Sequence, residues 1–205
     1  MRGNQDTTLR GQQVLLVPYE PHHVPRYHEW MKSPELQILT ASEPLTLEQE
    51  YDMQRSWRED LDKCTFIILD ALKWDQGIPE EQCMVGDVNL FLTDPDNPSL
   101  AEIEVMIADP SYRGRGLGGE SVRLMLYYGV TSLRISIFEA KIGQENVASV
   151  RLFHKLHFQE VSSSEVFKEV TLQWEVTDLE LHWLTNSTPF KMASYRETRD
   201  QTAHS

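Results

Sequence analysis

The chain has 205 residues, of which 40% are hydrophobic and 25% are charged. Domains commonly hold roughly 100–200 residues, so this length suits one domain with or without a tail. Its 19 basic and 32 acidic residues give a formal net charge of −13, which excludes a general basic surface for nucleic acid. A single local basic pocket is still compatible with that total.

Few features of the sequence point to disulfides, metals or membranes. Cys64 and Cys83 are the two cysteines, and so few thiols are typical of a reducing compartment. The first residues are polar, and the apolar runs are far shorter than the roughly 20 residues of a membrane helix. The seven histidines form no ligand pattern with the cysteines. We expect a cytoplasmic monomer with no metal site, no membrane association and no nucleic-acid partner.

Hydrophobic periodicity predicts the elements of the first half of the chain. Strands are expected at 12–19, 65–69, 84–92 and 101–108. A helix should begin near Pro21 and end before Ser33-Pro34, and Thr46 with Gln49 forms the capping box of a second helix. The segments 73–82 and 93–100 contain proline and read as a loop and a turn.

The second half begins with a glycine-rich basic turn over 113–119. A helix, a strand over 134–142 and a helix capped by Asn146 follow, and 158–161 with 166–176 predicts a hairpin. After Leu184 the chain is polar and lacks periodicity, which indicates a loose tail. The element order predicts one mixed α/β domain with an antiparallel front half and a strand-helix-strand crossover. Trp57, Trp74 and Trp174 are expected in its core.

The turn Gly114-Arg-Gly-Leu-Gly-Gly119 satisfies the dinucleotide pattern G-x-G-x-x-G. Five residues separate it from the preceding strand, however, and about a hundred precede it, which argues against that interpretation. A plain flexible turn is another alternative. We favour a phosphate cradle, because glycine backbones, a helix N-terminus and the side chains of Arg113 and Arg115 all attract anions.

Two motifs resemble the GNAT (general-control-related N-acetyltransferase) superfamily. Arg113-x-x-Gly116-x-Gly118 looks like its acetyl-CoA pyrophosphate loop, and the segment from Asn146 to Phe158 resembles its Asn-x-x-Ser helix. The resemblance implies a single GNAT domain over 1–184, with a mostly antiparallel sheet, a central splayed parallel pair of strands and flanking helices. The residues 185–205 would form a flexible tail.

Longer segments, at 41–51, 84–93, 102–108 and 138–144, resemble an animal branch of the superfamily. That resemblance implies transfer of an acetyl group from acetyl-CoA to a protein amino-terminus, with tubulin amino-termini as the proposed acceptors. Two alternatives stay open. The chain could be a weakly active or inactive protein that binds acetyl-CoA or microtubules, or an acetyltransferase for small amines.

The same resemblance assigns cofactor-binding residues. The backbone that binds the pantetheine arm and polarises the thioester would belong to the end of the strand before the glycine-rich turn. The pyrophosphate would lie in the turn itself. The implied cofactor residues are Met106, Ile107, Ala108, Arg113, Gly114, Arg115, Gly116, Leu117, Gly118 and Asn146.

The catalytic groups are less clearly indicated. Glu102 is the candidate general base, because some relatives keep a catalytic glutamate at that place on the strand, and Glu104 on the same face competes with it. Either carboxylate could instead be solvated or recognise a cationic substrate. Phe153 stands where many relatives have a tyrosine that acts as general acid, and His157 replaces the usual glycine before Phe158. Either the thiolate leaves unassisted, or Tyr127, Tyr128 or His154 takes the place of the missing acid.

Overall fold

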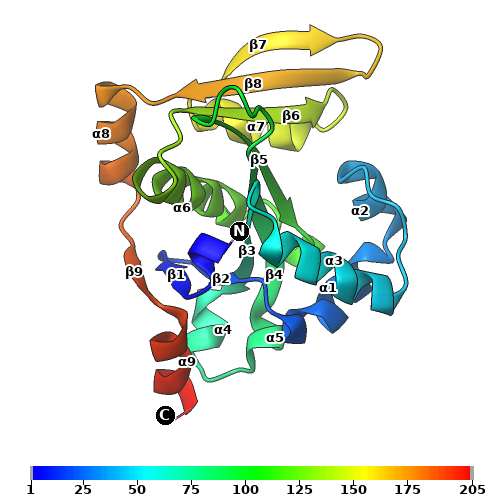
Figure 1. The fold of residues 1–205 in the computed structure, drawn as a ribbon, viewed down its shortest axis with the longest axis vertical. Coiled ribbons are helices and arrows are strands. Elements are labelled where there is room, and N and C mark those ends of the chain that lie inside the picture. The colour runs from blue at the N-terminus through cyan, green and yellow to red at the C-terminus, as the bar shows by residue number, and fades with distance from the viewer. Residues whose placement is uncertain (1, 204–205) are drawn as a thin grey trace.

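The computed structural model describes residues 2–203, which form a mixed sheet flanked by helices on both faces (Figure 1). Within this range the strand order is β7-β8-β6-β5-β4-β3-β2-β1-β9. The strands are β1 (Thr7–Arg10), β2 (Val14–Pro18), β3 (Lys63–Asp70), β4 (Met84–Phe91), β5 (Leu100–Ile107), β6 (Ile137–Gly143), β7 (Gln159–Ser164), β8 (Glu169–Glu175) and β9 (Lys191–Ser194). The helices are α1 (Val24–Met31), α2 (Pro34–Leu39), α3 (Leu47–Glu59), α4 (Ala71–Asp75), α5 (Glu80–Cys83), α6 (Leu117–Ser132), α7 (Val147–Lys155), α8 (Asp178–Ser187) and α9 (Tyr195–Ala203). Short 3₁₀ turns occur at Arg2–Asn4, Pro21–His23 and Pro110–Tyr112.

The pair β5 and β6 is parallel, and every other strand pair described is antiparallel. The two parallel strands are paired only from Leu100 to Glu102 on β5 and from Ile137 to Glu139 on β6. Beyond these residues β5 stays with β4 while β6 stays with β8, so the sheet splits. Figure 1 shows β6, β7 and β8 crossing the top of the molecule at a steep angle to β5. This is the mixed, mostly antiparallel sheet with a splayed parallel pair that the sequence predicted.

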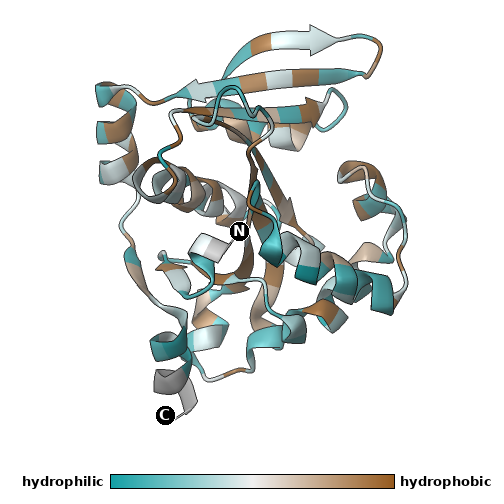
Figure 2. Cartoon of the chain, in the orientation of Figure 1, coloured by the Kyte–Doolittle hydropathy of each residue, from teal (hydrophilic) through white to brown (hydrophobic). Residues whose placement is uncertain are grey.

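The two faces of the sheet bury separate apolar clusters. One cluster packs α6, α7 and α8 against the sheet, and the other packs α1, α2, α4 and α5 against the opposite face. The close packing of α6 depends on Gly129, because a Cβ there would lie 2.7 Å from the ring of Phe138 on β6. The hydropathy colouring shows the same layering, with brown strands at the centre and largely teal helices α3 and α9 at the surface (Figure 2).

Most predicted elements are present, and their local signals are visible. The side chain of Thr46 accepts a hydrogen bond from the backbone of Gln49 and the side chain of Gln49 accepts one from Thr46, which completes the predicted capping box of α3. The prediction of a loop over 73–82 is wrong in part, since α4 covers its first residues and α5 its last. Asp70 explains α4, because its carboxylate caps that helix by accepting from the backbone of Leu72 and Lys73.

The residues after Leu184 adopt regular structure as far as they are described, although the sequence predicted a flexible tail over 185–205. Strand β9 pairs antiparallel with β1, with Leu9 opposite Met192, and α9 follows it. The short sequence of β9 shows no alternation of polar and apolar residues that predicts a strand. The division of the chain at residue 184 stays a prediction. Within the described part, no helix is long and apolar enough to cross a membrane.

Candidate active site

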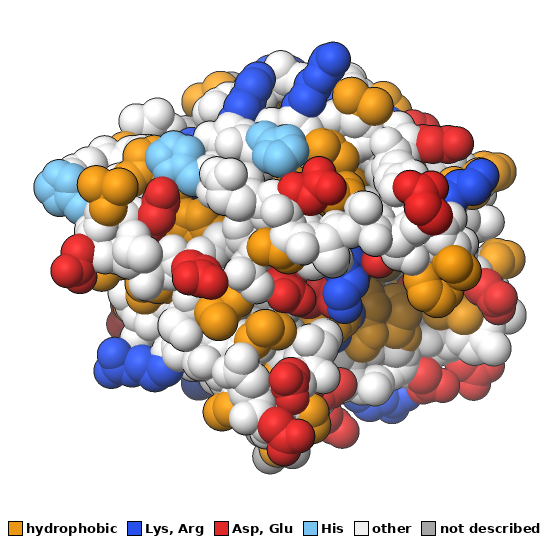
Figure 3. Space-filling view, turned by 90° about the horizontal axis from the view of Figure 1, so that it is seen from above, with side chains coloured by type: hydrophobic (Ala, Val, Ile, Leu, Met, Phe, Trp, Pro, Cys, Tyr) orange, Lys and Arg blue, Asp and Glu red, His pale blue; other side chains and the backbone are white. Residues whose placement is uncertain are grey.

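A cleft of about 960 Å³ opens where β5 and β6 diverge. Strands β4 and β5 form its floor, and its walls are α2 with the following loop on one side and β6, α7 and the β7–β8 turn on the other. Figure 3, which views the molecule from above over the hairpin, shows a hollowed surface with hydrophobic side chains inside and charged side chains around it. The splay that the sequence resemblance implied therefore produces a ligand-sized space.

The backbone of β5 has an unpaired edge along this cleft. Ala108 donates its N–H to Val85 of β4 at 2.9 Å, and the register places Gly86 opposite Ile107. Because the direction of backbone groups alternates along an antiparallel strand, the amide groups of Val105 and Ile107 face away from β4. The backbone of Met106 and Ala108 points to β4 instead, so Val105, which sequence reasoning missed, joins Ile107 as a candidate for binding the pantetheine arm.

The glycine-rich turn connects β5 to α6 through two left-handed residues. Gly114 has a φ of +70° and Gly116 a φ of +91°. Gly116 is the N-cap of α6, and no side chain caps that helix. The amides of Leu117 and Gly118 in the first turn are thus available to an anion, and the helix dipole adds partial positive charge. The turn thus has the backbone geometry that a phosphate cradle requires, and its role in binding phosphate stays a prediction.

The two arginines of the turn are engaged differently. Arg113 donates through Nε to the carbonyl of Ile107 at 3.0 Å, and its guanidinium pairs with Glu35 of α2 at 2.7 Å. Arg115 is exposed and lies over the ring of Tyr112, 5.1 Å from its centroid. Arg113 therefore ties the end of β5 to α2, and Arg115 is the arginine with a free approach to a phosphate.

Glu102 and Glu104 both line the cleft from the same face of β5. Glu102 accepts a 2.7 Å hydrogen bond from Nζ of Lys141 on β6. Among the described residues Glu104 accepts no hydrogen bond. Its side chain is open to the cleft, and its carboxyl group is partly shielded from bulk water by the cleft walls. That partial burial and the neighbouring charge of Glu102 raise the pKa of Glu104 to about 7. Glu104, which competed with Glu102 in the sequence analysis, is thus a candidate general base.

A buried polar group beneath the cleft was not anticipated. Asp87 of β4 is 3% exposed and accepts hydrogen bonds from the hydroxyl of Tyr27 at 3.2 Å and from Asn89 at 3.0 Å. Lys63, at the start of β3, lies beside it with its Nζ 3.0 Å from the centroid of the Trp57 ring. Trp57 therefore lines the cleft, whereas Trp74 and Trp174 are buried as predicted. Tertiary packing brings these residues together from separate elements, and no local motif marks their arrangement.

The comparisons with known proteins agree with this geometry. A model of the "Acetyltransferase (GNAT) domain" matches residues 13–159. The human alpha/beta-tubulin-N-acetyltransferase 9 is 64% identical over 191 residues, which cover 92% of each chain. The chain belongs to the GNAT acetyltransferase family. As a member of it, the protein is an acyltransferase. The family and the fold predicted from the sequence are confirmed.

Solved structures of other GNAT proteins share the fold. The ribosomal L7/L12 alpha-N-protein acetyltransferase RimL in complex with coenzyme A is 17% identical, with a TM-score of 0.65, and the match covers 80% of this chain and 95% of that one. The spermidine N-acetyltransferase from Vibrio cholerae in complex with CoA and spermine is 18% identical, also with a TM-score of 0.65, and covers 86% of this chain and 98% of that one. Both of those proteins bind CoA.

In this GNAT chain Asn146 caps α7 as predicted, since its side chain accepts from the backbone of Ser149 at 3.2 Å, and it also lines the cleft. Phe153 of the same helix is 2% exposed and packs edge-to-face against Phe158. In the described part of the chain, none of the acid candidates Tyr127, Tyr128 and His154 lines the cleft. Unassisted loss of the thiolate is thus the favoured alternative among those considered.

His157 occupies a position that favours glycine. Its φ is +69°, in the left-handed region that costs a residue with a Cβ roughly 1 kcal/mol. Contacts compensate this cost, because His157 Nδ1 lies 2.9 Å from a Glu180 carboxylate oxygen and its ring stacks near Trp183. The residue terminates α7 with the geometry of the usual glycine, so its presence alters the surface and leaves the cleft unchanged.

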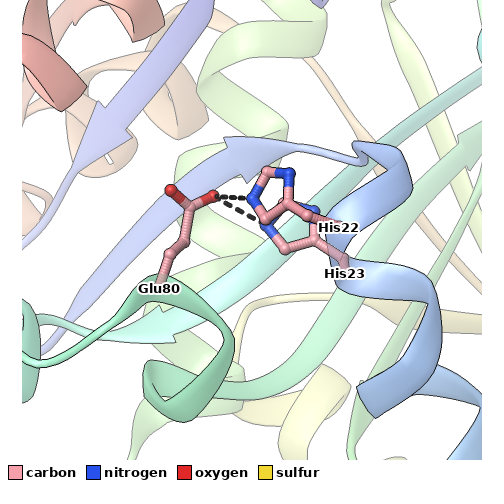
Figure 4. A group of neighbouring side chains, drawn as sticks. All are labelled: His22, His23 and Glu80. Carbon is pink, nitrogen blue, oxygen red and sulfur yellow. Dashed lines mark hydrogen bonds and ion pairs between the residues drawn. The ribbon is translucent and has the colours of Figure 1, made fainter.

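One cluster resembles a metal site, formed by His22, His23 and Glu80 (Figure 4). Glu80 Oε1 lies 3.2 Å from His22 Nε2 and 2.6 Å from His23 Nε2, and it accepts from the hydroxyl of Tyr195 at 2.7 Å. His23 Nδ1 accepts a hydrogen bond from the backbone N–H of Glu20, so Nε2 carries the ring proton and donates a hydrogen bond to Glu80. In that tautomer Nε2 has no lone pair for a metal. The cluster instead fastens α9 to the body of the protein, and the absence of a metal cofactor stays a prediction.

Proposed function

We propose that this GNAT protein transfers an acetyl group from acetyl-CoA to the α-amino group of a protein, with tubulin amino-termini as acceptors. The observation that carries the proposal is the cleft between the splayed strands, with the carboxyl group of Glu104 facing it unpaired. The name of the human relative, alpha/beta-tubulin-N-acetyltransferase 9, supports tubulin as the acceptor. We further propose that the protein acts as a cytoplasmic monomer.

The residues present fit acetyl-CoA. The uncapped N-terminus of α6 and the exposed side chain of Arg115 suit its pyrophosphate, and the N–H groups of Val105 and Ile107, which face away from β4, suit its pantetheine arm. Open space at Gly114, where a Cβ would meet no atom within 4 Å, leaves room for the phosphates. When bound, acetyl-CoA supplies the acetyl thioester.

Glu104 would then take the proton of the acceptor amine. An α-amino group has a pKa of about 7.7–8.0, so it needs only modest help to become neutral. Glu104 accepts the proton that the amine loses when its nitrogen bonds to the acetyl carbon and the carbon–sulfur bond breaks; the CoA sulfur is protonated by water. The cleft contributes mainly by holding the amine and the thioester carbon in contact.

The mouth of the cleft suits the end of a polypeptide. Its rim carries the exposed side chains of Ile38 and Leu39 on α2 and of Phe167 at the β7–β8 turn. These apolar groups can cover the first side chain of an acceptor while the charged floor receives its amine. An overall charge of −13 also favours a cationic end group.

The experiment is CoA release with tubulin amino-terminal peptides, followed by mass spectrometry to locate the acetyl group. The matched control is the same peptide with its α-amine already blocked. We expect release with the free peptide only, with the acetyl group on the α-nitrogen. Measurable acetyl-CoA binding without CoA release would contradict the enzyme proposal and favour the alternative of a binding protein.

A further inference from the structure

The ammonium group of Lys63 is held inside the wall of the cleft. The residue is 5% exposed, and its Nζ lies 3.0 Å from the centroid of the Trp57 ring and 4.2 Å from that of Phe91. A cation over two aromatic faces is attracted by the negative charge of both π-systems, and the attraction grows when water is excluded. The proposed acetyl transfer assigns no role to this lysine.

Two carboxyl groups complete the surroundings of Lys63. Asp87 on β4 and Glu104 on β5 line the same cleft as Lys63, and both are close enough for their charges to act on it. Burial lowers the pKa of Lys63 to about 8, while the charges of Asp87 and Glu104 act in the opposite direction. At neutral pH Lys63 is therefore mostly protonated and offsets the acidic charge of this part of the cleft.

Two aromatic faces in contact with the ammonium group, with the negative charges of two carboxyl groups acting on it from further away, make a receptor for a primary ammonium ion. We propose that Trp57, Phe91, Asp87 and Glu104 form an ammonium box that the chain fills with its own Lys63, and that this lysine excludes diamines and polyamines as acceptors. The inference rests on the proposed function, and it chooses between amino-termini and small polyamines as the substrate class.

The reason for the exclusion is electrostatic. An acceptor amine that approaches Glu104 places any second ammonium group, a few bonds away, next to the box. Lys63 already occupies the box, so the second charge finds a like charge and no aromatic face or carboxylate of its own. The amino-terminus of a protein brings only the one reacting ammonium group, so Lys63 repels it less than it repels a diamine.

The test compares Lys63→Ala, which empties the box, with Lys63→Met, which fills it without a charge. The probe is 1,4-diaminobutane, with neutral 1,4-butanediol as the control, and binding is measured by calorimetry and by the shift in melting temperature. We expect the alanine variant to bind the diamine at least tenfold more tightly than the wild-type protein and the methionine variant do. Equal affinity in all three proteins would overturn the proposal.

A second variant keeps the test independent of folding. Lys63→Thr shortens the side chain with a residue that suits a strand, so it should also open the box if the alanine variant folds poorly. The wild-type protein gives a further readout, because it should release CoA with amino-terminal peptides and not with spermidine. Equal rates with peptide and spermidine would contradict the exclusion.

The outcomes separate this inference from the proposed function. If the alanine variant binds diaminobutane while no amine or peptide supports CoA release, the ammonium box stands and the acetyltransferase assignment fails. If peptides are acetylated and the alanine variant gains no diamine binding, the assignment stands and the box fails.

Discussion

Lys141 donates a 2.7 Å hydrogen bond to Glu102, while Glu104, two residues along the same face of β5, is left unpaired among the described residues. The ion pair keeps Glu102 occupied and bridges β5 to β6 just where the strands part. We therefore expect the two carboxylates to divide their roles, with Glu102 holding the strands at the head of the cleft and Glu104 taking part in proton transfer.

This division predicts different effects of two matched substitutions. Glu104→Gln should lower kcat/KM by about 10²–10⁴-fold, the usual contribution of a general base. Glu102→Gln, which retains a hydrogen-bonding group towards Lys141, should have a much smaller effect. Steady-state kinetics with an amino-terminal peptide checks both, and the reverse order would restore Glu102 as the base.

The pH dependence of the reaction follows from the same carboxyl group. Its pKa is raised to about 7, and only the ionised form accepts a proton, so kcat/KM should rise as the pH increases through 7. The Glu104→Gln variant should lose this step and keep only the step set by the acceptor amine near pH 8. Profiles of identical shape for the two proteins would argue against Glu104.

The left-handed glycine at the start of α6 offers a test of cofactor binding. Gly116→Glu places a carboxylate in the proposed pyrophosphate cradle and should abolish acetyl-CoA binding. Gly77→Glu is the matched control, because Gly77 has a similar φ of +73° but lies between α4 and α5. Both variants carry the same backbone strain, so calorimetry with acetyl-CoA isolates the loss caused by the cradle. Unchanged affinity in the Gly116 variant would refute the pyrophosphate assignment.

Gly86 of β4 allows β5 to approach. A Cβ at this position would lie 1.9 Å from the carbonyl oxygen of Met106, which is backbone and cannot rotate away. Gly86→Ala should therefore destabilise the protein by about 1–3 kcal/mol and displace the end of β5. Gly143→Ala on β6 is the control, since its Cβ meets no atom within 4 Å. Urea unfolding of the two variants provides the comparison.

The pH dependence of the free energy of unfolding should come in part from His23. Burial lowers the pKa of this residue below its ordinary value of 6.5. The unfolded chain then binds a proton at a higher pH than the folded protein does, so the free energy of unfolding falls as the pH drops below about 6.5. His23→Gln should flatten this dependence between pH 7.5 and 5.5 in urea unfolding. Parallel curves for both proteins would show that His23 does not contribute.

The hydroxyl of Tyr195 should contribute to stability through Glu80. Burial alone raises the pKa of Glu80, but hydrogen bonds from His22, His23 and Tyr195 outweigh it and hold the pKa well below its ordinary value. Tyr195→Phe removes one of these donors from a buried carboxylate and should cost about 1.5–3 kcal/mol. The melting temperature measures the loss, and Tyr51→Phe, on the exposed side of α3, serves as the control.

The sequence predicted the parts of the fold that depend on local chemistry. The capping box of α3, the glycine-rich turn and the alternation of Glu102 and Glu104 are readable within a few residues. The polar floor of the cleft could not be predicted, because Lys63 and Asp87 lie on different strands and become neighbours only in the folded protein. The same limit applies to β9, whose four residues acquire a strand conformation by pairing with β1.

The contact between the two ends of the chain has a consequence for biosynthesis. A ribosome makes β1 long before β9, so β1 remains an open sheet edge and Glu80 lacks Tyr195 until β9 and the start of α9 have been synthesised. Open sheet edges promote aggregation. Synthesis of β9 and α9 thus closes the edge and completes the carboxylate cluster together, and a product that stops before β9 lacks both.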